Sequence, residues 1–207
     1  QLRGLPQVVV ELQSTTSMAA IRLIILGRQG SGKGTQCVRL VEAYGPVHVS
    51  TGDMLRSAVA EGTELGLRAS ALMDAGDLVP DDVMIGIVVD RLAKPDVVEH
   101  GFLLDGFPRT PAQAEALEEI LSDTGADGVR AFNIEVPVDE VMERMLARGR
   151  GDDTEEAIRR RLDLYESTTA PLLAWFEEHG LLSFVDGLGT EDEVFDRLRT
   201  AIEAVSA

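Results

Sequence analysis

A glycine-rich segment at residues 27–36, G-R-Q-G-S-G-K-G-T-Q, directly follows an apolar run at residues 21–26. A loop of this kind between a buried strand and a helix turns several backbone N–H groups toward one point, where the helix dipole also favours an anion. The glycines permit close backbone approach, and Lys33 supplies a positive charge that can reach the terminal phosphates of a nucleotide. The segment therefore predicts a phosphate site rather than an incidental glycine-rich turn.

Two further segments carry polar groups that suit phosphate chemistry. Residues 50–56, S-T-G-D-M-L-R, follow a second apolar run, and we expect Thr51 to cap a helix from which Arg56 faces solvent. If this motif stood alone, a capped helix with an exposed arginine would be the preferred explanation. Residues 105–113, D-G-F-P-R-T-P-A-Q, place Asp105 where it could hold the water shell of Mg²⁺ and Arg109 where it could bind a phosphate.

The elements that must position these groups alternate along the chain. Strands are predicted at residues 21–26, 47–49, 102–105, 131–136 and 182–185. Helix starts are predicted after the capping hydroxyls of Thr110, Thr154 and Thr190. The alternation predicts an α/β fold, a five-stranded parallel sheet with helices on both faces. Ligands of such sheets bind beyond the carboxyl ends of the strands, so the three motifs are expected to meet there.

Composition limits the class of protein. At 207 residues the chain suits one α/β domain that buries roughly 70% of its unfolded surface. Its single cysteine, Cys37, excludes a zinc ribbon and indicates a reduced, cytoplasmic setting, where this residue would be a small buried apolar group. No apolar run approaches the roughly 20 residues that cross a bilayer. Residues 1–17, ahead of Met18, are interpreted as a leader or extension outside the fold.

The net charge of −17 argues against a nucleic-acid surface. Arginines nevertheless gather at positions 144, 148, 150, 159, 160 and 161, which suggests one small polyanionic ligand. For Arg159 and Arg160, a solvated helix face with Glu/Arg pairs is an equal alternative. The three histidines, His48, His100 and His179, have no partner spacing and are interpreted as structural.

From the first strand to the C-terminus the chain resembles adenylate kinases. The motifs that carry the resemblance are G-x-x-G-x-G-K-G-T-Q at 27–36, S-T-G-D-x-x-R at 50–56, A-G-D-L-V-P at 75–80, L-D-G-F-P-R-T-x-x-Q at 104–113 and G-R-G-D-D-T-E-E-x-I-x-x-R at 149–161. The resemblance implies a P-loop NTPase-type sheet with an AMP-binding insert at residues 50–79 and a short lid at 147–153. It also implies reversible phosphoryl transfer from MgATP to AMP, giving two ADP, by a monomer without zinc.

The resemblance also assigns residues to the two nucleotides. The ATP side comprises Gly30, Ser31, Gly32, Lys33, Gly34, Thr35, Arg144, Arg148 and Gly189. The AMP side comprises Thr51, Arg56, Asp77, Leu78, Val79, Gly106, Phe107, Pro108, Arg109, Gln113, Arg150 and Arg161. The implied catalytic set is Lys33, Asp105, Arg109, Arg148, Arg150 and Arg161. No side chain is expected to bind metal directly, and the water shell of Mg²⁺ is expected near Asp105 and Thr35.

Two departures and two alternatives accompany this interpretation. Gln29 stands where the family usually has proline, and Arg28, usually a small residue or proline, could add a phosphate contact. A uridylate/cytidylate kinase shares the fold, but Thr51 and Gln113 stand where that relative usually has alanine and asparagine. A nucleotide-binding regulator without turnover is the alternative from a different class of protein, and the intact set of cationic residues opposes it.

Overall fold

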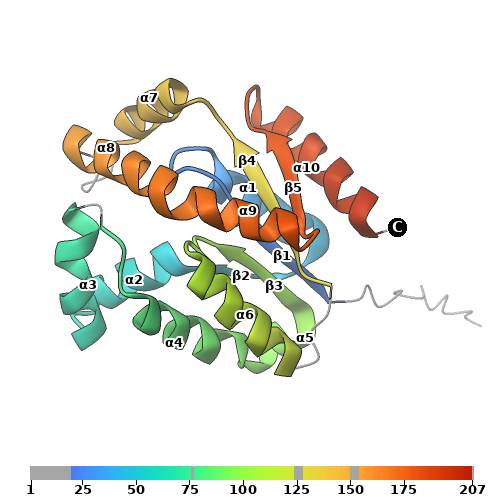
Figure 1. Ribbon diagram of the computed structural model, residues 1–207, viewed down its shortest axis with the longest axis horizontal. Coiled ribbons are helices and arrows are strands. Elements are labelled where there is room, and N and C mark those ends of the chain that lie inside the picture. Colours follow the sequence, from blue (N-terminus) through green and yellow to red (C-terminus); the bar gives the residue numbers. More distant parts are fainter. Residues whose placement is uncertain (1–19, 76, 124–127, 150–153, 207) are drawn as a thin grey trace, which may run out of the picture.

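Five parallel strands form the centre of the molecule. The computed structural model describes residues 20–75, 77–123, 128–149 and 154–206. The interpretation of residues 1–17 and the part of the lid at residues 150–153, with Arg150, lie outside them. The strands are β1 (Ile21–Leu26), β2 (Val47–Ser50), β3 (Gly101–Asp105), β4 (Arg130–Glu135) and β5 (Leu182–Asp186). They are ordered β2-β3-β1-β4-β5, all parallel (Figure 1). The predicted α/β class and five-stranded parallel sheet are confirmed.

Helices connect the strands. They are α1 (Lys33–Tyr44), α2 (Thr51–Ala60), α3 (Glu64–Ala75), α4 (Asp81–Leu92), α5 (Pro95–His100), α6 (Pro111–Asp123), α7 (Val138–Arg148), α8 (Glu155–Leu164), the π-helix η1 (Tyr165–Thr169), α9 (Ala170–Glu178) and α10 (Glu191–Ser206). The hydroxyls of Thr110, Thr154 and Thr190 each accept a hydrogen bond from the backbone N–H three residues later, at 3.2–3.3 Å. The three predicted helix starts are therefore confirmed.

Successive side chains of each strand point to opposite faces of the sheet, and helices bury both faces. Leu23 and Ile25 of β1 pack in one apolar layer with residues of α1, α8 and α10. Ile24 and Leu26 pack in the other with residues of α4, α6 and α9. Each fully buried side chain of this size contributes about 1.5–3 kcal/mol. The sheet is therefore a firm platform, and the loops that follow its strands are held in fixed places.

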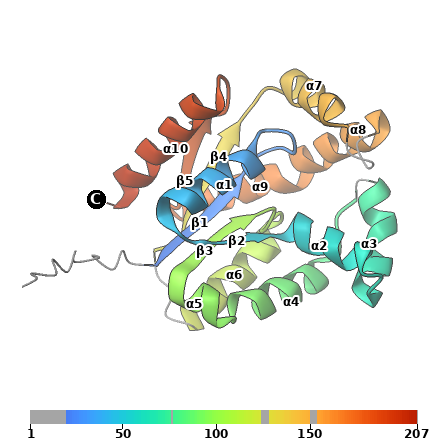
Figure 2. The same cartoon turned by 180° about the vertical axis from the view of Figure 1, so that it is seen from behind.

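The helices outside this platform gather at the carboxyl ends of the strands. Figures 1 and 2 show α2 and α3 on one side of this end and α7 and α8 on the other. The two groups touch where Arg161 of α8 donates a hydrogen bond from Nη2 to the carbonyl of Met73 in α3, at 2.9 Å. Within the described part of the chain, no helix combines the length and apolar character that crossing a membrane requires.

Candidate active site

A cleft of about 570 Å³ opens at the carboxyl ends of the strands. The phosphate loop, the start of α1, the end of β3 and arginines from α7 and α8 line it. A smaller cavity of about 80 Å³ adjoins it, lined by α2, by the chain after α3 and by Gln113 of α6. Arg56, Gly106, Arg109 and Arg161 line both spaces. The site is thus a pair of compartments that meet at three arginines.

The phosphate loop presents unsatisfied backbone donors at the start of α1. The residue before the helix, Gly32, has a left-handed backbone with φ 92°, and no side chain caps the first turn. The first N–H groups of a helix lack intrahelical partners, so these donors can bind an anion. Gly30 lets this loop lie close to α7, because a Cβ there would stand 2.7 Å from Cγ of Met145. The loop therefore has the geometry of a phosphate cradle.

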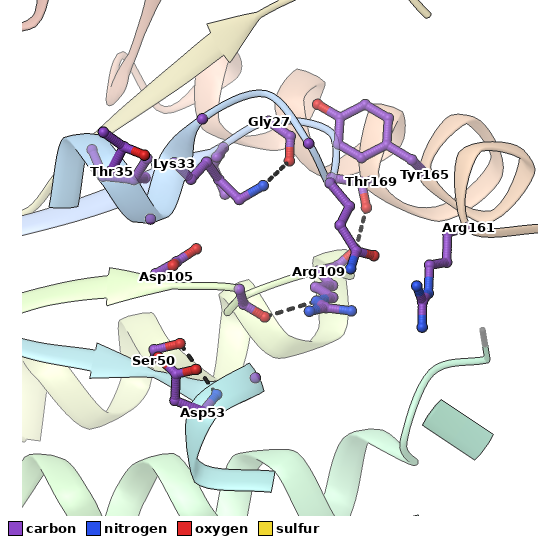
Figure 3. Close-up of a pocket in the computed structure, with 18 of the residues that line it drawn as sticks. Gly27, Lys33, Thr35, Ser50, Asp53, Asp105, Arg109, Arg161, Tyr165 and Thr169 are labelled. Carbon is purple, nitrogen blue, oxygen red and sulfur yellow. Dashed lines mark hydrogen bonds between the residues drawn. The ribbon is translucent and has the colours of Figure 1, made fainter. Parts of the chain in front are cut away.

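Lys33 lies at the mouth of this cradle. Its Nζ donates hydrogen bonds to the carbonyls of Gly27, at 2.7 Å, and Arg28, at 2.8 Å (Figure 3). Burial lowers the pKa of Lys33, and the charge of Asp105 opposes that shift. An anion in the cleft would stabilise the ammonium in the same way, so the side chain can exchange its carbonyl partners for phosphate oxygens.

Arg28 does not face the phosphate cradle. Its Nε and Nη2 donate to Oε1 of Glu166, Nη1 donates to the carbonyl of Val136 at 3.4 Å, and the guanidinium lies 5.0 Å from the ring centroid of Tyr165. These contacts turn the side chain toward η1. In this structure the guanidinium of Arg28 is therefore engaged away from the phosphate loop, and a phosphate contact from it would require the exchange of these partners.

Asp105 ends β3 beneath the phosphate loop. Burial alone would raise its pKa, but the neighbouring His48 imidazole and the charges of Lys33 and Arg109 outweigh burial and hold the pKa below its ordinary value. The carboxylate therefore stays ionised at neutral pH, which suits a group that orders waters around a cation. Thr35, in the first turn of α1, lines the same cleft. The water shell of Mg²⁺ near Asp105 and Thr35 stays a prediction.

His48 is the residue that the sequence interpretation missed most clearly. It lines the larger cleft, and its Nε2 lies 3.7 Å from Oδ2 of Asp105. The interpretation of His48 as structural did not include this position at the cleft, and a functional role for the residue is not tested. The strand pairing of Ser50 with Asp105 could have indicated this position, since His48 shares a face of β2 with Ser50. No local signal marked Tyr165, Thr168 and Thr169 of η1, which also line the cleft.

The start of α2 differs from the expectation. Ser50, not Thr51, is the capping residue, since its hydroxyl accepts from the N–H of Asp53 at 3.3 Å. Thr51 is the first residue of the helix, and its buried hydroxyl donates to the carbonyl of Asp105 at 3.4 Å. The strand ends at Ser50, so the helix starts one residue earlier than a cap at Thr51 would allow. Arg56 pairs with Asp53 at 2.5 Å.

Gln113 closes the smaller compartment. Only 2% of this residue is exposed. Its Oε1 accepts a hydrogen bond from the N–H of Arg109 at 2.8 Å, and its Nε2 donates to Oδ1 of Asp81 at 2.8 Å. Both ends of the amide are thus engaged within the protein, and the side chain holds the backbone of Arg109 in position.

The arginines of the site differ in their partners. Nε of Arg109 donates to the carbonyl of Gly106 at 2.8 Å, and its own carbonyl accepts from Oγ1 of Thr169 at 3.4 Å. Burial lowers the pKa of Arg109, while the charge of Asp105 opposes that shift. In Figure 3, Arg109 borders this space from the loop between β3 and α6, and Arg161 borders it from α8.

The arginines of α7 and α8 also differ in the acidic residues with which they pair. Arg144 lines the cleft and pairs with Glu140 at 2.8 Å. Arg159 pairs with Glu155 on a solvated helix face, which confirms that alternative for this residue. Arg160 instead pairs at 2.5 Å with Asp77, beyond α3. Arg160 therefore joins α8 to the segment expected to bind AMP.

Most of the predicted site residues lie at the two compartments. The larger is lined by Gly30, Gly32, Lys33, Gly34, Thr35, Arg56, Leu78, Asp105, Gly106, Pro108, Arg109, Arg144, Arg148 and Arg161. Thr51, Asp77, Val79 and Gln113 line the smaller. Ser31 and Phe107 are buried, and Gly189 lies in the β5–α10 loop, so these three line neither space.

These features define a P-loop nucleotide-binding protein with a parallel α/β sheet. The family model for adenylate kinase matches residues 25–181. The chain is similar to the adenylate kinase of Stenotrophomonas maltophilia, 46% identical over 188 residues that cover 89% of this chain and 100% of that protein. It is 47% identical over 184 residues to that of Thermus thermophilus, covering 87% and 96%, and 42% identical over 214 residues to that of Thermodesulfovibrio yellowstonii, covering 88% and 99%. The chain belongs to the adenylate kinase family.

Proposed function

We propose that the larger compartment holds MgATP and the smaller holds AMP. The reaction is the family's reversible transfer of a phosphoryl group between ATP and AMP. The observation that carries the assignment is the sharing of Arg109 and Arg161 by both compartments. A phosphoryl group that passes from one nucleotide to the other must cross the boundary between them, where these guanidinium groups can neutralise its oxygens.

Phosphoryl transfer needs little covalent chemistry from the protein, so catalysis rests on placement and on charge stabilisation. Lys33 and the N–H groups at the start of α1 hold the ATP phosphates, with Arg144 and Arg148 beside them. Arg109, Arg161 and Arg150 flank the transferring group. No protein nucleophile is needed. Asp105 and Thr35 would hold Mg²⁺ through water, and the cation would supply positive charge to the ATP phosphates.

On the AMP side, Arg56 and Arg109 supply phosphate donors, and Asp77, Leu78 and Val79 line the space for the nucleoside. Residues 50–79 act as the AMP-binding insert and residues 147–153 as the short lid, and their closure over the nucleotides would exclude water. Gln113 uses one lone pair of Oε1 for Arg109 and one N–H for Asp81, so its second N–H and second lone pair can still read the adenine edge. Its first role is to fix the backbone that carries Arg109.

A coupled assay with ATP against AMP, CMP, UMP and GMP tests the proposal. We expect AMP to be preferred by at least about tenfold, since a pocket that hydrogen-bonds one base leaves polar groups unpaired with another. Equal or faster turnover of UMP or CMP would instead favour a uridylate/cytidylate kinase. Binding of ATP without transfer to any monophosphate would favour a regulator. We also propose that the protein is cytoplasmic and acts as a monomer. Its mass in solution tests the monomer.

A further inference from the structure

Three side chains that can bind metal converge beneath the phosphate loop. They are Cys37 of α1, His48 of β2 and Asp105 of β3, and their ligand atoms all lie within 4.8 Å of one another. Nε2 of His48 is buried and has no hydrogen-bond partner among the described residues, and it lies 3.7 Å from Oδ2 of Asp105. The Cys37 side chain is fully buried. The cluster thus holds a nitrogen, a sulfur and an oxygen donor in one place.

The fold brings these donors together from distant parts of the sequence. The parallel pairing of β2 with β3 sets Ser50 opposite Asp105 and His48 opposite Leu103. His48 and Asp105 therefore project from the same face of the sheet, two residues apart in register. Helix α1 packs on that face, and Cys37 lies one turn after Lys33.

We propose that Cys37, His48 and Asp105 form a site for a thiophilic divalent cation, best matched by Zn²⁺, distinct from the Mg²⁺ that accompanies ATP. Zinc binds cysteine, histidine and carboxylate ligands at about 2.0–2.3 Å, often with three protein ligands and one open position. Mg²⁺ prefers oxygen ligands and its own water, so it does not compete well for a thiolate and an imidazole.

The binding step is a ligand exchange. A bond forms between zinc and Sγ of Cys37 as zinc releases a bound water. The S–H bond breaks, and the proton and the water leave to solvent. Tetrahedral ligands at about 2.0–2.3 Å from the metal lie roughly 3.3–3.7 Å from one another, so the three side chains must move together by about an ångström. The bound thiolate and carboxylate neutralise the two charges of the cation, which limits its repulsion with the neighbouring Lys33.

Occupancy of this site inhibits phosphoryl transfer. Zinc would take the carboxylate of Asp105 as a direct ligand, and that carboxylate would then no longer order the waters of Mg²⁺. This consequence rests on the proposed role of Asp105, whereas the site itself rests only on the three converging donors. Direct metal binding and turnover therefore test separate statements.

The first experiment uses the nucleotide-free protein without a histidine tag and Co²⁺ as a spectroscopic substitute for zinc. We expect a near-ultraviolet thiolate-to-cobalt charge-transfer band that saturates at one Co²⁺ per chain and disappears when Zn²⁺ is added. The wild-type spectrum alone decides whether a thiolate binds the metal, even if a variant fails to fold. Absence of the band at saturating Co²⁺ would overturn the proposal.

The second experiment measures Zn²⁺ affinity by titration calorimetry for C37S and H48N, with H100N as the matched control. Loss of one ligand should weaken Zn²⁺ binding by about tenfold or more. H100N should bind as the wild type does, because His100 lies at the end of α5 with its Nδ1 near the carbonyl of Asp96. Unchanged affinity in both C37S and H48N would overturn the proposal.

Turnover completes the test. Zn²⁺ at one equivalent should lower turnover of the wild type in the presence of excess MgATP, and a chelator followed by Mg²⁺ should restore it. C37A, which removes only a buried thiol, should keep its basal turnover and resist Zn²⁺. If the cobalt band shows the site but Zn²⁺ leaves turnover unchanged, the result would support the site and contradict the assigned role of Asp105 with Mg²⁺.

Discussion

The side chain of Arg28 in the phosphate loop binds Glu166 in η1, 138 residues further along the chain, with Nε 3.0 Å from Oε1. The same guanidinium lies over the ring of Tyr165, whose hydroxyl donates to Asn133 of β4 at 3.2 Å. The carbonyl of Arg28 also accepts from Lys33. Arg28 thus contacts both Lys33, through its backbone carbonyl, and η1, through its side chain. This tertiary contact can restrain a loop that lacks the family's usual proline.

Breaking this contact should destabilise the protein modestly and loosen ATP binding. A double-mutant cycle of R28M and E166Q should give a coupling free energy of unfolding of about 0.5–1 kcal/mol, because Glu166 is half exposed and such pairs are screened by water. R28M should raise KM for ATP more than it lowers kcat. The matched cycle of R159M and E155Q, on a solvated helix face, should leave both kinetic constants unchanged. An equal effect of the two cycles on KM would contradict a positioning role for Arg28.

Replacing Lys33 by methionine should remove turnover and preserve the fold. The variant loses the charge aimed at the transferring phosphate but keeps most of the packing of the side-chain stem, so kcat should fall by roughly 10² or more. Thermal unfolding should show a cooperative transition near that of the wild type. Near-normal kcat in a folded K33M protein would show that another cation performs this role.

The lowered pKa of Lys33 gives ATP binding a pH dependence. In the free protein, burial favours the neutral amine, so deprotonation begins below the ordinary lysine value of 10.5. ATP phosphates favour the charged form and raise the pKa. Between the two pKa values binding must take up a proton, and affinity must fall as pH rises. Calorimetry in buffers of different ionisation enthalpy measures this uptake, and K33M should lose it on the alkaline side.

Turnover should require Mg²⁺, while the nucleotide-free fold should not require any metal. Adding a chelator to the complete assay should stop turnover, and excess Mg²⁺ should restore it, because the cation would supply the positive charge that the ATP phosphates need during transfer. The melting temperature of the nucleotide-free protein should stay almost constant with chelator. A large fall in that temperature would reveal a structural metal.

Replacing Gln113 by leucine should impair the AMP side selectively. The variant leaves the N–H of Arg109 without its side-chain acceptor, which costs about 1–3 kcal/mol for a buried group, and it leaves the carboxylate of Asp81 with the hydroxyl of Thr110 but without the Gln113 donor. KM for AMP should therefore rise by roughly tenfold, with a smaller change for ATP. Q36L, which replaces another buried glutamine in α1, controls for the loss of a buried amide. A larger effect of Q113L on ATP than on AMP would contradict the assignment of the smaller compartment.

The sequence by itself determined the strands, the capped helices and the phosphate loop. Apolar runs such as that of β1, capping hydroxyls such as Thr110, and the spacing of Gly30, Lys33 and Thr35 act within a few residues, so their signals are local and readable. The alternation of these elements then fixed a parallel sheet, whose strand ends had to bring Asp105 close to the loop.

Only the tertiary structure decided which partner each polar side chain binds. Arg28 turned to Glu166, Arg160 to Asp77 and Gln113 to Asp81, and none of these partners is a neighbour in sequence. His48 came to Asp105 through the pairing of β2 with β3. A long side chain can reach many partners. The fold favours the arrangements in which buried polar groups are hydrogen-bonded and disfavours those that would leave them unpaired. The chemistry of the residues was therefore written in the sequence, while their pairing was set by the fold.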